Sequence, residues 1–198
     1  MDENLKEINL KYQTIKLCKF FEEKNVYSYN IKQADSNYYN LSLDQRREFL
    51  GSNCNDNLCK TIILENKNFD ETKESKYYKR YYMCIVQYIS EFNAEKISKL
   101  LKKRQNDNCE EKLSNKYFHF RLSKDEVAFE MTGYYFNCIT PYLMKSDSIE
   151  ILFPENLMSV YPYYLWLGGG EIELKVGISI FDFINLYKSK IIIGDILS

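Results

Sequence analysis

Apolar residues recur along the N-terminal stretch 4–24 at the spacing of an α-helix. The residues at this spacing are Leu5, Ile8, Tyr12, Ile15 and Cys18. Because an α-helix turns once every 3.6 residues, these side chains would share one face. The pattern predicts an amphipathic helix, and its mixture of lysines and glutamates disfavours binding to a membrane. We therefore predict an N-terminal helical segment over residues 1–25, followed by one domain over residues 26–198.

Short runs of β-branched and aromatic residues follow, separated by polar segments. Such runs are typical of β-strands. We predict strands at 26–31, 61–64, 81–89, 117–122, 136–139, 149–153 and 163–167. In the fourth run, alternation places Phe118, Phe120 and Leu122 on one face. Residues 81–89 contain Ile85 and Val86, and we expect them to form a central strand.

Capping residues mark helices between these strands. We predict helices at 43–50, 94–104, 123–132 and 179–187. Gly51 suits the end of the first, and the Asn93 side chain can accept the first amides of the second. Ser123 with Glu126 three residues later matches a capping box, and Gly133 would end that helix. Because helices and strands interleave irregularly, we expect a mixed α/β (α+β) fold, with a mixed sheet surrounded by helices.

Composition is that of a globular protein. The 198 residues are 45% hydrophobic and 28% charged, which suits one domain with its own core. The formal net charge is −1, so a site for a polyanion must be a local patch. Residues 1–7 lack the features of a secretory signal, and no apolar run approaches the roughly 20 residues of a membrane span. We therefore expect a cytoplasmic protein.

Metal and nucleophile chemistry find little support in the sequence. The six cysteines include no Cys-x-x-Cys pair and have no accompanying histidine cluster, so we expect reduced thiols and no metal. His119 is the only histidine, and without a Gly-x-Ser-x-Gly motif we favour a surface histidine over a catalytic one. Phosphate-binding and dinucleotide-binding glycine motifs are also absent, and we expect no cofactor.

Three segments contain residues suited to bind a ligand. Lys60 precedes the apolar run 61–64, where its ammonium group either attracts an anion in a cleft or simply reaches solvent. Residues 133–141 form a turn that either exposes backbone amides to an oxygen or is only structural. The glycines at 168–170 follow an aromatic strand. They either form a tight turn or let a ligand come close to the backbone.

Four motifs that include these segments occur in a distinctive order. They are Tyr38-Tyr-Asn-Leu-Ser-Leu-Asp-Gln-Arg46, Leu58-Cys-Lys-Thr-Ile-Ile-Leu-Glu-Asn66, Gly133-x-x-x-Asn137-x-x-Thr140-Pro141 and Trp166-Leu-Gly-Gly-Gly-Glu-Ile-Glu-Leu-Lys175. Their order resembles the YbaK/prolyl-tRNA-editing domain family, and its eukaryotic branch in particular. The resemblance extends over residues 26–184, which is nearly the whole chain.

This resemblance implies a mixed α/β fold around a highly curved sheet. It also implies a trans-acting aminoacyl-tRNA deacylase that hydrolyses the ester of mischarged tRNA without a metal, with the terminal ribose 2′-hydroxyl assisting attack by water. Its partners would be mischarged tRNA and an aminoacyl-tRNA synthetase. The implied catalytic residues are Lys60, Gly133 and Thr140. The implied substrate-binding residues are Asn137, Ile139, Pro141, Gly168, Gly169 and Gly170.

The chain also departs from the bacterial pattern of this family. Asn137 replaces the second glycine of the loop, Tyr142 replaces a phenylalanine, and Leu143 stands where a glycine often follows. Because larger side chains would reshape the aminoacyl pocket, bacterial specificities for cysteine, alanine or proline do not transfer to this chain.

Two further hypotheses concern binding without catalysis and binding of tRNA. Lys96, Lys99 and Lys103 would share a helix face that either contacts tRNA phosphates or, as we favour, is simply solvated. The alternatives to a deacylase are a non-catalytic module that binds tRNA or a synthetase, and a hydrolase of small aminoacyl esters that ignores tRNA.

Overall fold

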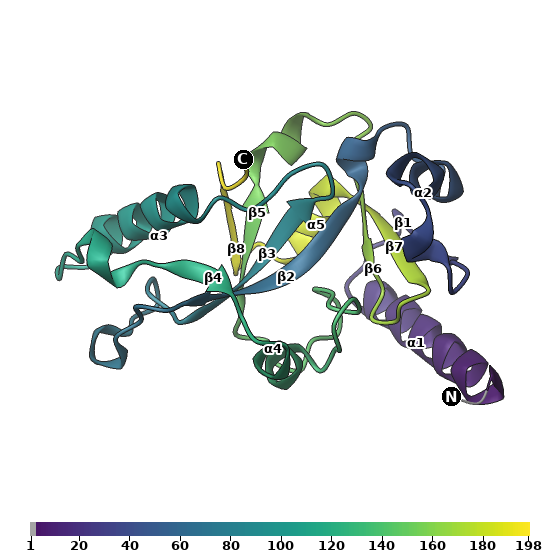
Figure 1. The fold of residues 1–198 in the computed structure, drawn as a ribbon, viewed down its shortest axis with the longest axis horizontal. Helices are drawn as coiled ribbons and strands as arrows, with labels where there is room; N and C mark the ends of the chain where they lie inside the picture. The colour runs from purple at the N-terminus through teal and green to yellow at the C-terminus, as the bar shows by residue number, and fades with distance from the viewer. Residues whose placement is uncertain (1–2) are drawn as a thin grey trace.

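Two β-sheets form the centre of the computed structural model, which describes residues 3–198 (Figure 1). The smaller, antiparallel sheet has the order β1-β7-β6, with β1 at Tyr29–Gln33, β7 at Leu174–Ser179 and β6 at Tyr164–Gly168. The larger sheet has the order β4-β2-β3-β5-β8. Its strands are β4 (Phe120–Leu122), β2 (Cys59–Asn66), β3 (Tyr81–Gln87), β5 (Glu150–Pro154) and β8 (Ile191–Gly194). Parallel pairing of β5 with β3 and β8 makes this sheet mixed, which confirms the expected fold class.

The helices lie around these sheets. They are α1 (Glu3–Glu23), α2 (Leu43–Leu50), α3 (Ala94–Asn108), α4 (Asp125–Thr132) and α5 (Ile180–Leu186). The caps at Gly51, Asn93 and Gly133 are confirmed: both glycines adopt the left-handed conformation, and Asn93 accepts the amides of two residues in α3. The capping box at Ser123 is wrong. Lys124 precedes α4, because the Ser123 amide donates to the Ile63 carbonyl and so continues the pairing of β4 with β2.

Some predicted strands are shifted or absent. The first begins at Tyr29 rather than at residue 26, and residues 117–119 lie outside β4. The predicted strand at 136–139 is wrong, because the chain turns there and the Cys138 amide donates to the Tyr135 carbonyl at 2.9 Å. Asn137 has a φ of 65°, which lies outside the β region of backbone conformation.

Two layers of apolar side chains cover the faces of the larger sheet. Ile97 and Leu101 of α3 pack against one face, together with Cys84 and Val86 of β3. Ala128 of α4 belongs to the core on the other face, which also contains side chains of α1, α5 and the smaller sheet. The two sheets meet where Leu58, next to the start of β2, pairs with Trp166 of β6.

Helix α1 is present as expected, but the face that it buries differs from the prediction. Leu10, Leu17 and Phe21 are buried in the core that α1 shares with both sheets. The predicted inward residues Leu5, Ile8, Tyr12 and Ile15 are each more than half exposed. The helix carries two apolar stripes, and Gln13 interrupts the buried one. The proposed boundary at residue 25 therefore falls between α1 and a strand with which it shares a core.

Candidate functional site

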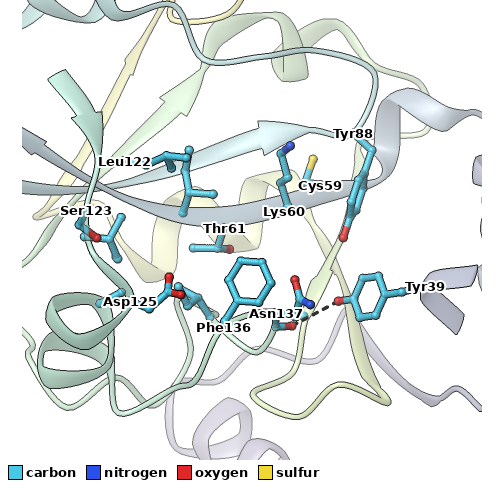
Figure 2. Close-up of a pocket in the computed structure, with 15 residues that line it drawn as sticks. Tyr39, Cys59, Lys60, Thr61, Tyr88, Leu122, Ser123, Asp125, Phe136 and Asn137 are labelled. Carbon is cyan, nitrogen blue, oxygen red and sulfur yellow. Dashed lines mark hydrogen bonds between the residues drawn. The ribbon is translucent and has the colours of Figure 1, made fainter. Parts of the chain in front are cut away.

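A cavity of about 410 Å³ lies between β2, the start of α4 and the loop 133–141 (Figure 2). Its lining residues are Tyr39, Cys59, Lys60, Thr61, Ile62, Ile63, Tyr88, Leu122, Ser123, Asp125, Ala128, Phe136, Asn137, Ile139 and Gly168. Strand β4 pairs with β2 only over Leu64–Asn66. The first half of β2 therefore has no paired β4 residue beside it, and the cavity lies along this part of the strand. The lining includes four of the expected site residues, namely Lys60, Asn137, Ile139 and Gly168.

Lys60 lies inside β2, one residue after the strand begins, rather than ahead of it. Its Nζ is 6.0 Å from the centre of the Tyr88 ring. Within residues 3–198 this ammonium group forms no ion pair with a carboxylate. Successive residues of a strand point to opposite faces, and Figure 2 shows the Lys60 nitrogen at the margin of the cavity, away from Phe136. The charge therefore lies across β2 from the Thr61 hydroxyl, beside Tyr88 at the rim of the cavity.

The Thr61 hydroxyl points into the cavity and was not expected from the sequence (Figure 2). The residue is only 8% exposed, and its Oγ1 has no hydrogen-bond partner among the described residues. Because a buried hydroxyl without a partner costs free energy, a polar ligand atom here would be stabilising. Beside it, Ile63, Ala128 and Ile139 provide an apolar wall. The signal in the sequence was a hydroxyl beside Lys60 in an otherwise apolar strand.

The remaining residues predicted in the loop 133–141 hold it in place and do not line the cavity. Gly133 ends α4, and its amide donates to the Phe129 carbonyl at 2.8 Å. The Thr140 hydroxyl donates to the Gly168 carbonyl at 2.6 Å, and the Tyr187 hydroxyl donates to the Pro141 carbonyl at 2.8 Å. These contacts fix both ends of the loop.

Asn137 and Leu143 adopt left-handed backbone conformations, with φ values of 65° and 55°. These are the two positions where the family resemblance led us to expect glycine. Asparagine tolerates this conformation better than most residues, whereas leucine rarely adopts it. The backbone thus keeps a glycine-like path at both positions while carrying larger side chains.

The glycine triplet divides between the cavity and the protein interior. Gly168 lines the cavity, whereas Gly169 and Gly170 are buried in the turn between β6 and β7. The Gly169 amide donates to the Leu174 carbonyl, and its own carbonyl accepts from Gln13 Nε2 of α1. Only Gly168 is therefore placed to contact a ligand in the cavity.

We expect Gly170→Ala to destabilise the protein by about 1–3 kcal/mol, because Gly170 has a φ of 93° that other residues adopt only under strain. A Cβ atom there would also lie 2.5 Å from Gln13 Nε2 and 2.6 Å from Tyr134 Cε1. Denaturant unfolding measures the effect. Gly168→Ala is the control, since its Cβ would come no nearer than 3.6 Å to another group. Equal stability of the two variants would contradict the structure.

A cluster of tyrosines and cations borders the cavity on the side of α2. Arg46 lies 5.3–5.5 Å from the rings of Tyr38, Tyr39 and Tyr88, and it donates to the Tyr39 carbonyl at 2.7 Å. Burial raises the pKa of Tyr39 and of Tyr88, so both hydroxyls stay protonated at neutral pH. The tyrosine–arginine motif was visible in the sequence, but its place beside the cavity was not.

The other candidates from the sequence lie outside this cavity. Lys96, Lys99 and Lys103 belong to α3, which covers the face of the sheet opposite α4 (Figure 1). Lys96 Nζ contacts the Asp195 carboxylate at 2.9 Å, whereas Lys99 and Lys103 are exposed. His119 is exposed and accepts from Arg121 Nε.

Nothing in the cavity provides an activated thiol. Cys59 contributes to the lining, but burial raises the pKa of its thiol and keeps it protonated. In the part of the chain that the structure describes, no three His, Cys, Asp or Glu residues converge as metal ligands. No helix within residues 3–198 has both the length and the apolar character needed to cross a bilayer.

Comparison with known proteins places the fold but not the family. No family model matches the sequence, and no curated protein matches it. A candidate trans-editing enzyme for prolyl tRNA synthetase matches in structure with a TM-score of 0.69 and 11% identity, over 94% of this chain and 97% of that one. A hypothetical protein matches with a TM-score of 0.66 and 13% identity, over 92% and 99%. At such identities the likeness establishes the fold, and this chain has the YbaK-like fold.

Proposed function

We propose that this chain belongs to the YbaK/prolyl-tRNA-editing family and is a cytoplasmic, trans-acting aminoacyl-tRNA deacylase. The observation that supports this most is that Lys60, Asn137, Ile139 and Gly168 share one cavity, in a fold shared with a candidate trans-editing enzyme. An unpaired cation at the margin suits the phosphates of an RNA end. Backbone amides and a buried hydroxyl deeper in the cavity suit the ester and its amino acid.

The loop 133–141 would stabilise the reacting carbonyl group. Within residues 3–198 the amides of Asn137 and Ile139 donate to no protein acceptor, so they are free to bind the oxyanion. One preorganised donor of this kind contributes roughly 3–4 kcal/mol to a transition state. Water attacks the carbonyl carbon and gives up a proton to the oxygen of the ribose 2′-hydroxyl. The 2′-hydroxyl in turn donates its own proton to the departing 3′-oxygen. The bond between the carbonyl carbon and this oxygen breaks, releasing the amino acid and tRNA.

The sequence-derived roles are thereby refined. Lys60 binds a phosphate of the RNA end, and Gly168 lets the substrate pass close to the backbone. Gly133, Thr140 and Pro141 act indirectly, since their hydrogen bonds hold the loop in place. Thr61 offers its unpartnered hydroxyl to the amino acid. Gly169 and Gly170 shape the turn behind Gly168.

A panel of mischarged tRNAs tests this function directly. Release of an amino acid above the uncatalysed rate supports a deacylase. The alternative is a module that binds tRNA or a synthetase without turnover, which the large residues Asn137 and Leu143 at left-handed positions favour. Binding with no release across the whole panel would establish that alternative. Equal turnover of aminoacyl-adenosine and intact aminoacyl-tRNA would instead indicate a hydrolase of small esters.

Phe136→Ala should weaken binding of the RNA end. Phe136 is 66% exposed and lines the cavity, where a nucleobase of an unpaired strand can stack on its ring. Because such stacking contributes about 1–3 kcal/mol per base, we expect KM for mischarged tRNA to rise roughly tenfold with little change in kcat. Tyr27→Ala removes an exposed ring outside the cavity lining and serves as the control. An unchanged KM for Phe136→Ala would exclude this contact.

A further inference from the structure

Lys175 is a buried lysine directly behind the cavity wall. It lies on β7 opposite Gly168 of β6, and it is only 4% exposed. Its Nζ donates to the Ile172 carbonyl at 2.7 Å and to the Tyr39 hydroxyl at 3.1 Å. It also lies 4.5 Å from the ring centres of Tyr38 and Tyr39. Burying a charged ammonium group costs free energy, so protein stability alone does not explain a lysine at this position.

Tyr39 connects this lysine to the cavity. Its hydroxyl donates to the Asn137 carbonyl at 3.3 Å, as the dashed line in Figure 2 shows. An ammonium group has only donors, so it can meet the Tyr39 oxygen only by donating to it. The single proton of Tyr39 is then left for another acceptor, which is the Asn137 carbonyl at 3.3 Å, with the Tyr88 hydroxyl as its neighbour on the cavity side. The hydrogen bonds therefore run in one direction, from Lys175 through Tyr39 to the loop.

We propose that Lys175 is a positioning residue whose charged form fixes the Tyr39 hydroxyl on the Asn137 carbonyl and thereby orients the neighbouring loop amides. The left-handed conformation of Asn137 makes such a restraint valuable, because an unrestrained residue would leave this backbone geometry. The consequence for catalysis rests on the deacylase function proposed above. The hydrogen-bond relay itself does not depend on that function.

The relay should respond to pH. The pKa of Lys175 is lowered to about 8, mainly by burial and also by the nearby Arg46 charge, while Cys138 and Glu173 act in the opposite direction. Glu173 is itself ion-paired with Lys6. Burial raises the pKa of Tyr39, and the neighbouring Tyr88, Tyr38 and Cys138 raise it further, so this hydroxyl keeps its proton across that range. Above pH 8 the neutral amine of Lys175 can accept a hydrogen bond from the Tyr39 hydroxyl. The Asn137 carbonyl then loses its hydrogen bond to Tyr39.

The experiment compares wild type with Lys175→Met, Lys175→Arg and Tyr39→Phe. Deacylation is followed from pH 6.5 to 9.5 after subtraction of spontaneous ester hydrolysis, and the amide NMR signals of residues 137–139 are titrated in parallel. For wild type we expect kcat to fall about three- to fivefold between pH 7 and pH 9, since one pH unit above the pKa leaves about a tenth of the lysine charged and the uncharged form keeps the reduced activity expected of Lys175→Met. The loop signals should shift with the same midpoint.

Lys175→Met and Tyr39→Phe should each lower kcat at pH 7 by roughly five- to tenfold, the range for one lost hydrogen bond, and should abolish the pH-dependent shift of the loop signals. Lys175→Arg, if folded, should remove the alkaline decline because arginine stays charged. The control is Lys32→Met, since Lys32 pairs with Lys175 across β1 and β7 but contacts the Phe49 carbonyl instead of the loop.

The NMR measurement separates the two proposals. If no mischarged tRNA is hydrolysed but the loop signals titrate near pH 8 only when Lys175 is present, the deacylase function fails and the relay stands. If wild type is active and Lys175→Met keeps both its kcat and its alkaline decline, the relay is overturned. A loop whose signals do not titrate in wild type would likewise overturn it.

Discussion

Lys60→Ala is expected to lower kcat/KM for deacylation of mischarged tRNA by roughly ten- to a hundredfold. A hydrogen bond to a charged group contributes about 1.5–3 kcal/mol, and Lys60 is the lysine of the cavity lining. Its ammonium group pairs with no carboxylate in the described chain, so the substitution leaves no buried protein charge behind. The loss should therefore appear in catalysis and not in folding. Steady-state kinetics together with an unfolding curve measures both quantities.

Two further variants make this result specific. Lys60→Arg keeps the charge and should retain part of the activity together with the wild-type dependence on salt, whereas Lys60→Ala should weaken that dependence. Lys188→Ala removes the same charge from an exposed position outside the cavity lining, and it should leave kcat/KM unchanged. If Lys60→Ala retains the wild-type kcat/KM, Lys60 has no part in the site.

Phe21→Ala should destabilise the protein by about 3–5 kcal/mol, the usual cost of deleting a buried phenylalanine ring. The Phe21 side chain is fully buried. It stacks on Tyr29 of β1 with ring centres 4.5 Å apart and meets the edge of Tyr142 at 5.2 Å. The substitution would therefore remove a contact that joins α1, the smaller sheet and the segment after the cavity loop. Denaturant unfolding measures this loss as a lower free energy of unfolding, with an unchanged dependence of that free energy on denaturant concentration.

Ile8→Ala on the same helix is the matched control for Phe21→Ala. Ile8 is 61% exposed, and surface substitutions usually change stability by less than about 0.5 kcal/mol. The sequence pattern by itself would predict the opposite order, because it places Ile8 on the inward face. A larger effect at Ile8 than at Phe21 would show that the helix is rotated from its position in the structure.

Local signals in the sequence correctly located most elements. The caps at Gly51, Asn93 and Gly133 and several strands depend on contacts within a few residues, so a local pattern suffices to find them. Strands β7 and β8 were not predicted, although both contain β-branched residues. The strand predicted at 136–139 failed because its apolar composition carries no information about φ at Asn137. The capping box failed because Ser123 forms a hydrogen bond with Ile63, which is distant in the sequence.

The candidate site was identified in part, for a related reason. Lys60, Asn137, Ile139 and Gly168 stood out as separate motifs, and the structure gathers them in one cavity. Thr61 was missed because its significance depends on being buried without a hydrogen-bond partner. Tyr39 and Lys175 were recognised as parts of motifs 136 positions apart, and only their hydrogen bond reveals a connection.

The sequence by itself determined the fold class, the order of the motifs and a short set of residues with suitable chemistry. Those properties follow from local spacing and residue type. The tertiary structure decided which stripe of α1 is buried, which glycine of the triplet reaches the cavity, and on which side of the sheet the lysines of α3 lie. Each of these depends on contacts between distant segments, where burial and hydrogen bonding outweigh the periodicity of any single element.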